Sequence, residues 1–183
     1  MTFFIKSYSQ TPILPLGDVR DINGAYYKDL NNQLDPFVGT WKYTNGNTSL
    51  TITLQKKLIQ EFQDGGYHFF HDILAGEYKY IENNIEKINT LSEFSVQKGP
   101  FEYSITGNIL FGQGKYLRTE FSQYDVNIPG METAMFFERV DFNGVQKLKL
   151  IFKMTEGPIE VEGQSYPNPY FTLPFGEYIL IKQ

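Results

Sequence analysis

The chain has 183 residues, a net charge of −5, 16 phenylalanines, 13 tyrosines and no cysteine. The absence of cysteine excludes disulfides, thiol nucleophiles and zinc sites of the thiolate kind. Only three arginines and no dense basic run argue against a nucleic-acid or anionic-membrane surface, and no apolar run approaches the roughly 20 residues that span a bilayer.

Residues 1–34 are predicted to form an extended leader that ends in a short helical turn. The run from Phe3 to Ile5 is shorter than the roughly 7–15 apolar residues of an export signal, but the small residues after it resemble the end of one. A remnant of such a signal would indicate a periplasmic or secreted protein. A plain disordered leader, on a cytoplasmic protein, is the alternative. The helical pattern runs from Tyr26 to Leu34, and Pro36 would end it.

Residues 35–183 are predicted to form one β-domain, because a chain of this length buries enough surface to need no disulfide or metal. The first hairpin of this domain contains the only tryptophan. A two-residue turn at Asn45-Gly46 pairs Trp41 with Leu50. The apolar side chains of the hairpin then share one face, and the polar ones share the other. The apolar set is Trp41, Tyr43, Leu50, Ile52 and Leu54.

Turn residues recur at short intervals after this hairpin, between segments rich in Tyr, Phe, Ile, Thr and Val, which predicts an antiparallel meander. A second two-residue turn, at Asn143-Gly144, fixes another register. The pairs it makes on the apolar face are Arg139 with Leu148, Phe137 with Leu150, and Met135 with Phe152. Arg139 therefore lies among apolar side chains, where a guanidinium is unfavourable unless it is paired.

With Gly39-Thr40-Trp41 on the first strand and an inward arginine, Arg139, on a late strand, the chain resembles the lipocalin or calycin superfamily. In that superfamily the tryptophan closes one end of the barrel and the arginine packs across its ring. The resemblance implies an all-β fold, a single antiparallel up-and-down barrel of about 8–10 strands. Two features depart from it. The T-D-Y signature expected between middle strands is not evident. Two strands also follow Arg139, around residues 146–155 and 176–182, whereas the superfamily arginine lies on or near the last barrel strand.

The chain also resembles, more closely, an uncharacterised family of small exported bacterial proteins of the Bacteroidetes type. Three segments carry this resemblance: "FVGTWKYTNGNTSLTITLQKK", "GEYKYIENN" and "FTLPFGEYILIKQ". It spans about residues 35–183 and implies no known activity.

No catalytic constellation is evident, so the chain is predicted to be a non-enzyme without a cofactor. The only histidines, His68 and His71, would point to opposite faces of a strand, and no metal site is expected. Arg139 has two interpretations. It would either anchor a carboxylate or phosphate in an apolar cavity, or cap the barrel by stacking on Trp41 and bonding loop carbonyls. The cap is the favoured interpretation.

The leading functional hypothesis is a non-enzymatic barrel that binds a small apolar or amphipathic molecule in its interior. The candidate ligand-binding residues are Arg139, Trp41, Tyr43, Phe137, Leu148, Leu150 and Phe152. The main objection is that so many aromatic side chains would fill a barrel of this size.

The alternative hypothesis is a protein–protein interaction module, such as an inhibitor or immunity-type partner, with a filled barrel and an acidic, tyrosine-rich outer face. The tyrosines predicted on strands are Tyr78, Tyr80, Tyr103, Tyr116, Tyr124 and Tyr178. A connected cavity beside Arg139 would favour the ligand binder, and a filled interior with an exposed aromatic patch would favour the partner binder. The identity of any ligand and the oligomeric state stay open.

Overall fold

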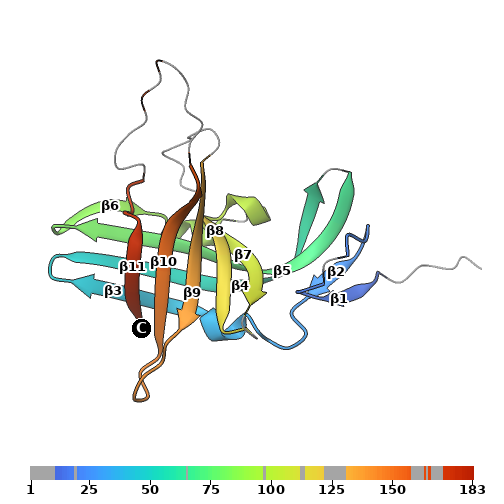
Figure 1. Ribbon diagram of the computed structural model, residues 1–183, viewed down its shortest axis with the longest axis horizontal. Helices are drawn as coiled ribbons and strands as arrows, with labels where there is room; N and C mark the ends of the chain where they lie inside the picture. Colours follow the sequence, from blue (N-terminus) through green and yellow to red (C-terminus); the bar gives the residue numbers. More distant parts are fainter. Residues whose placement is uncertain are drawn as a thin grey trace, which may run out of the picture.

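The computed structural model describes residues 11–18, 20–64, 66–96, 98–111, 114–121, 131–157, 163, 165 and 171–183. In this part of the chain the protein is all-β, with one sheet of 11 strands and three short 3-10 helices (Figure 1). The strands are β1 (Ile13–Pro15), β2 (Tyr26–Lys28), β3 (Gly39–Asn45), β4 (Thr48–Asp64), β5 (Tyr67–Glu82), β6 (Ile85–Asn89), β7 (Ile105–Phe111), β8 (Tyr116–Phe121), β9 (Glu132–Arg139), β10 (Lys147–Glu156) and β11 (Gly176–Lys182). The 3-10 helices are η1 (Asp35–Phe37), η2 (Leu91–Ser95) and η3 (Pro100–Glu102). Among the described residues, no helix is long and apolar enough to cross a membrane.

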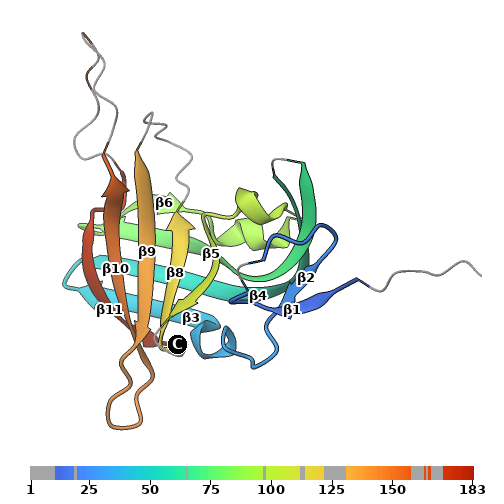
Figure 2. The same cartoon turned by 45° about the vertical axis from the view of Figure 1, so that its right-hand side comes forward.

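Eight of these strands close into an antiparallel barrel (Figures 1 and 2). Strands β3, β4 and β5 are neighbours in chain order, and so are β7, β8, β9, β10 and β11. β11 returns to pair with β3, and β5 pairs with β7, which completes the circle. The predicted all-β, up-and-down barrel is thereby confirmed as a closed antiparallel barrel, to which β1, β2 and β6 are additions.

Two glycines allow the barrel to close where β5 meets β7. Gly76 lies opposite Ile105, and Gly107 lies opposite Leu74. A Cβ atom on Gly76 would come within 2.7 Å of Leu54 and 2.9 Å of Ile105, and one on Gly107 would come within 2.7 Å of the backbone of the neighbouring strand. A side chain at Gly76 would therefore push β5 away from β7, and one at Gly107 would push β7 away from β8.

The interior of the barrel is filled by side chains from all of its strands. The largest fully buried side chains include Trp41, Tyr78, Phe137 and Phe152. Leu34 and Phe37, around η1, join this core at the end where Trp41 lies, and Phe171 and Leu173, just before β11, join it at the end where Phe152 lies. An eight-stranded barrel has room for its own side chains or for one small ligand, and here apolar side chains fill the interior and lie at both ends.

Strands β4 and β5 are much longer than the barrel requires, and their far halves project from it as a hairpin (Figure 2). We call residues 57–73 the projecting hairpin. β2 pairs with β5 in parallel there, Tyr26 opposite Phe70 and Tyr27 opposite His71, and β1 adds to β2 in the same way. A bulge between Lys57 and Gln60 separates the barrel half of β4 from the projecting half.

The two hairpins predicted from asparagine–glycine turns differ in outcome. The Asn143-Gly144 turn is confirmed: both residues have positive φ, and Arg139 lies opposite Leu148 and Phe137 opposite Leu150. In the first hairpin the predicted register is wrong. Trp41 lies opposite Ile52 rather than Leu50, because the loop consists of Gly46 and Asn47. The register shift is two residues, so the predicted apolar face is unchanged.

The helical turn predicted from Tyr26 to Leu34 is wrong. Tyr26–Lys28 is strand β2, held by pairing with β5, and this tertiary pairing overrides a weak local pattern. After β2 the chain turns around Asp29, whose carboxylate accepts hydrogen bonds from the backbone N–H groups of Gln33, at 2.7 Å, and Leu34, at 3.0 Å. The only helical turn nearby is η1, which begins at Asp35. Residues 1–10 of the predicted leader lie outside the described residues.

Candidate functional site

The residues predicted to bind a ligand lie in the barrel, but they are in contact with one another rather than with an open space. Trp41, Phe137, Leu148 and Leu150 are 0% exposed and Phe152 is 1% exposed, so a water-sized sphere reaches almost none of their surface. Tyr43 is half-buried and packs edge-on against Tyr178, with ring centroids 5.2 Å apart. A ligand would reach these side chains only by displacing some of them.

Arg139 lies over the ring of Trp41 at the end of the barrel, with its guanidinium carbon 5.2 Å from the ring centroid. The guanidinium donates hydrogen bonds to the carbonyl oxygen of Pro36 and to both carboxylate oxygens of Asp141. These bonds use three of the five N–H donors of the guanidinium. The same bonds, with the backbone N–H of Lys147, lower the pKa of Asp141. Arg139 therefore has the geometry of the cap, the second of its two sequence-based interpretations, because it stacks on Trp41 and bonds a loop carbonyl.

The other side chains around Trp41 complete this end of the barrel. The indole N–H donates to the carbonyl oxygen of Phe37 at 2.8 Å, and the Lys182 ammonium lies 5.3 Å from the ring centroid. Gly39 has a φ of +137°, and a Cβ there would lie 2.8 Å from the Lys182 side chain. The G-x-W pattern thus has a physical cause: the glycine leaves room for the lysine that lies over the tryptophan.

A second, smaller apolar cluster lies outside the barrel, beneath the crossover that connects β6 to β7 and contains η2 and η3. Its buried members are Ile73, Ala75 and Tyr103, and Phe62 and Phe94 pack against it. Since Ile73 and Ala75 alternate with the inward residues of β5, they lie on the outer face of the barrel wall. The crossover therefore covers one side of the projecting hairpin's base.

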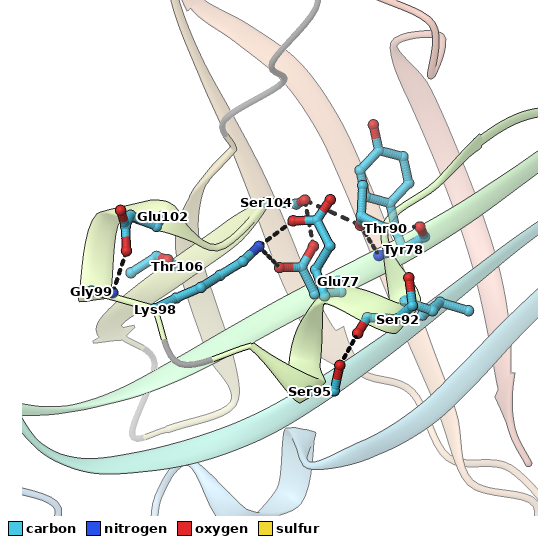
Figure 3. Close-up of polar contacts among 12 residues, drawn as sticks. Glu77, Tyr78, Thr90, Ser92, Ser95, Lys98, Gly99, Glu102, Ser104 and Thr106 are labelled. Atoms are coloured by element: carbon cyan, nitrogen blue, oxygen red, sulfur yellow. Dashed lines mark hydrogen bonds and ion pairs between the residues drawn. The ribbon is translucent and has the colours of Figure 1, made fainter.

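A buried polar network fixes this crossover to the barrel (Figure 3). The Glu77 carboxylate, fully buried, accepts a bond from the Lys98 ammonium at 2.8 Å and one from the Ser104 hydroxyl at 2.6 Å. Thr90 connects the network to the barrel, because its hydroxyl accepts from the backbone N–H of Tyr78 at 3.0 Å. Lys98 also bonds Glu93. Each buried charge has a partner of opposite charge, so the network holds the crossover against the outer face of the barrel.

A groove of about 830 Å³ separates the crossover from the projecting hairpin. Its lining residues come from the far half of β4 and from the start of η3; they are Ile59, Gln60, Glu61, Gln63, Lys98, Gly99, Pro100 and Phe101. The ring of Phe101 is 61% exposed and packs edge-on against Phe62, with centroids 5.0 Å apart. The groove is therefore an open, partly aromatic surface outside the barrel.

The hairpin beside the groove carries a ladder of aromatic rings on one face. Tyr27 stacks on His71 at 4.5 Å, and Phe62 stacks on Phe69 at 5.6 Å. His71 accepts a hydrogen bond on Nδ1 from the amide of Asn108 at 2.8 Å. Burial lowers the pKa of His71 to about 4, so the ring is neutral at neutral pH. The ladder connects β2 to the hairpin and continues toward the hairpin's tip.

His68 and His71 do not converge on one site. His68 bonds Glu61 at 2.7 Å, whereas His71 bonds Asn108. Most of the tyrosines predicted on strands are buried, namely Tyr78, Tyr80, Tyr103 and Tyr178, and Tyr124 lies outside the described residues. The exposed aromatic surface beside the groove is therefore formed by the hairpin and η3, not by the predicted tyrosines.

A strained bulge at Leu58-Ile59 shapes the groove. Ile59 has a φ of +53°, an unfavourable conformation for a β-branched residue, and both side chains are more than half exposed. The buried carboxylate of Asp72 holds the bulge by accepting from the Ile59 N–H at 3.1 Å. It also accepts from the Tyr26 hydroxyl at 2.6 Å and the Asp29 N–H at 3.0 Å. Asp72 thereby connects β2 to the strained strand.

Sequence reasoning missed the bulge and its carboxylate, although a signal exists. From Leu50 to Gln55 apolar and polar residues alternate, and Leu58-Ile59 breaks the alternation with two adjacent apolar residues after two lysines. Such a break is typical of a β-bulge. The part played by Asp72 has no comparable signal, because its partners lie far away in the sequence.

A model of a family of unknown function (DUF6705) matches residues 1–183. This match agrees with the resemblance to an uncharacterised family. Comparison with the curated proteins and with the solved structures found no match.

Proposed function

This chain belongs to the DUF6705 family of unknown function, and we propose that it is a protein-binding module that holds a basic partner polypeptide in the groove beside its projecting hairpin. One observation carries the proposal: the barrel interior is filled, while an open groove with the exposed side chains of Ile59 and Phe101 lies outside it. Exposed apolar side chains gathered beside polar ones are typical of protein-interaction sites. Here Leu58, Ile59 and Phe101 are each more than half exposed.

The charges around the groove favour a basic partner. Lys98, which lines the groove, bonds both Glu77 and Glu93, so its charge is more than balanced. Glu61 also lines the groove and is exposed, and in the described structure its carboxylate contacts only His68. Glu102 accepts from the Gly99 N–H at 2.5 Å at the start of η3 and adds a further negative charge. Complementary charges would speed encounter with a basic partner and exclude acidic ones.

The barrel itself is proposed to be of the calycin type. Its support is that Arg139 lies over the ring of Trp41, in the Gly39-Thr40-Trp41 strand, at one barrel end, although two strands, β10 and β11, follow Arg139 in the chain. In this proposal the barrel is a scaffold, and its cap stabilises the fold.

Interior binding of a small amphipathic molecule is the second candidate. Its support is a group of tyrosines away from Arg139, where Tyr43 packs on Tyr178 and burial raises the pKa of both Tyr80 and Tyr178. Such rings would give a ligand apolar walls with polar tips. Native mass spectrometry of protein purified from its own host distinguishes the candidates: a retained small molecule supports interior binding, and the bare chain mass contradicts it.

The main proposal is tested by site-specific photo-cross-linking in the native host. A photoreactive residue replaces Gln63 in the groove, and a control replaces Ile179, which is 47% exposed on β11 away from the hairpin (Figure 1). We expect one partner to be captured from position 63 and not from position 179. Equal capture from both positions, or none from position 63, would contradict the proposal.

The captured partner is then purified, and its affinity for two matched variants is measured. Phe101→Ala removes an exposed ring from the groove, and Phe142→Ala removes one of similar exposure, 64% against 61%, from the far β9–β10 hairpin. We expect Phe101→Ala to weaken the complex about tenfold or more, as loss of an aromatic anchor does, and Phe142→Ala to leave it unchanged. Equal affinities would overturn the assignment of the groove.

A further inference from the structure

The two edges of the projecting hairpin differ. The β5 edge is covered by the chain's own N-terminal segment, through the pairing with β2 and through backbone bonds from Gly24 to His68 and from Phe70 to Ala25. The β4 edge has no such cover. β3 pairs with β4 only as far as Leu54, and in the described structure no strand pairs with residues 55–64 on that side. One edge of the hairpin has therefore already received an added strand, and the other has not.

Part of the open edge is protected by local contacts. Lys56 bonds Asp29 and Asp35, each at 2.8 Å. In the bulge, the N–H of Ile59 donates to Asp72, and the carbonyl oxygen of Leu58 accepts from the Gln60 side-chain amide at 2.9 Å. These contacts end at the bulge. Residues 60–64 contain no proline and no second bulge, which are usual ways to block an edge strand.

The groove runs along this unprotected edge rather than over one face of the strand. Gln60 and Glu61 are consecutive in β4 and lie opposite His71 and Phe70, so their side chains point to opposite faces of the hairpin. Both nevertheless line the groove, together with Gln63. A groove lined by consecutive residues of a strand runs along the edge of that strand. Its other wall is the start of η3.

We infer that the partner binds as an extended segment that adds to residues 60–64 of β4 as a new antiparallel or parallel strand. This inference rests on the proposed function and specifies its mode. Backbone bonds to the open edge would supply affinity, and alternate side chains of the added strand would supply specificity. On one side the added strand would meet Phe101 and favour an apolar residue. On the other it would meet Glu61 and favour lysine or arginine.

The inference is tested with a library of random dodecapeptides displayed on phage, selected on the full chain and depleted on Phe101→Ala. The selected peptides are synthesised, each also with alternate backbone amides methylated, which removes N–H donors and keeps every side chain. Binding is measured by titration calorimetry, and protection of residues 60–64 is measured by amide hydrogen exchange. A neutral oligosaccharide, maltohexaose, is titrated in parallel.

Strand addition predicts basic, apolar-alternating peptides that protect amides within residues 60–64. Methylating every second amide gives two forms of each peptide, one methylated at odd positions and one at even positions. One of the two forms should bind about tenfold or more weakly, because it loses several backbone bonds together. Peptides that bind without protecting residues 60–64, and tolerate methylation in both frames, would overturn strand addition and leave the protein-binding proposal intact. Failure to enrich any peptide over Phe101→Ala, or binding of maltohexaose alone, would overturn both.

Discussion

The two halves of β4 differ in burial and in backbone conformation. In the barrel half, Leu50, Ile52 and Leu54 are at most 1% exposed and pack inward. In the bulge, Leu58 and Ile59 are 56% and 58% exposed and face solvent beside a groove. The barrel half has the dense packing of a core, whereas the projecting half retains exposed apolar groups and backbone strain. The comparison agrees with the proposal, in which the barrel provides stability and the hairpin provides the surface for recognition.

The largest expected effect is the removal of a ring from the barrel core. Phe137→Ala deletes a fully buried side chain and should lower the free energy of unfolding by about 3–5 kcal/mol. Phe101→Ala removes an exposed ring from the groove and should lower it by at most about 1 kcal/mol. Urea denaturation of both variants measures the difference. Similar losses would remove the distinction between scaffold and surface.

The next effect concerns the cap. Arg139→Ala removes a stacked cation and its bonds to Pro36 and Asp141, and should lower the free energy of unfolding by about 2 kcal/mol without any ligand present. Lys182→Ala removes the second cation over Trp41 and should lower it by less than about 1 kcal/mol. If the Arg139→Ala variant were as stable as the wild type, the result would instead indicate that Arg139 serves to bind a ligand.

A smaller effect is expected from pH, and it arises in the hairpin. Burial lowers the pKa of His71 from 6.5 to about 4, so below pH 6.5 the unfolded chain binds a proton that the folded one does not. Stability should therefore fall as the pH is lowered from 7 to 5. The full shift corresponds to about 3 kcal/mol, and the partial exposure of the ring reduces the expected loss in this window to about 1 kcal/mol. His71→Gln should remove that loss, and the control His68→Gln should keep it, in urea denaturation at both pH values.

An effect of similar size has the opposite sign. Ile59→Gly relieves a positive φ at an exposed position and should raise the free energy of unfolding by about 1 kcal/mol. The same change removes a side chain from the groove and should lower the affinity for the partner. A variant that becomes less stable, measured by thermal unfolding, would show that the bulge is not strained.

The sequence-based predictions succeeded where the interactions are local and failed where they join residues far apart in the chain. The Asn143-Gly144 turn was predicted correctly because both residues accept the positive φ that the turn requires. At Asn45-Gly46-Asn47 the same rule placed the loop one residue too early, since glycine occupies the first loop position instead of the second. The even shift preserved the inward faces, so the barrel core was still identified.

The projecting hairpin and its groove could not be predicted in this way. They depend on β2 pairing with β5 across more than forty residues, Tyr26 opposite Phe70, and on a crossover held by the Glu77–Lys98 pair. Neither pairing leaves a local pattern in the sequence. The false helical turn has the same cause, because the segment containing Tyr26 takes its structure from a distant strand.

The most direct test of the account is an amide NMR titration of the full chain with the binding segment of the captured partner. The chain has one tryptophan, so its indole N–H, buried in the barrel and bonded to Phe37, reports on the interior, while the amides of residues 60–63, 99 and 101 report on the groove. We expect the groove amides to shift and the indole signal to stay in place. Movement of the indole signal with unchanged groove amides would contradict the account.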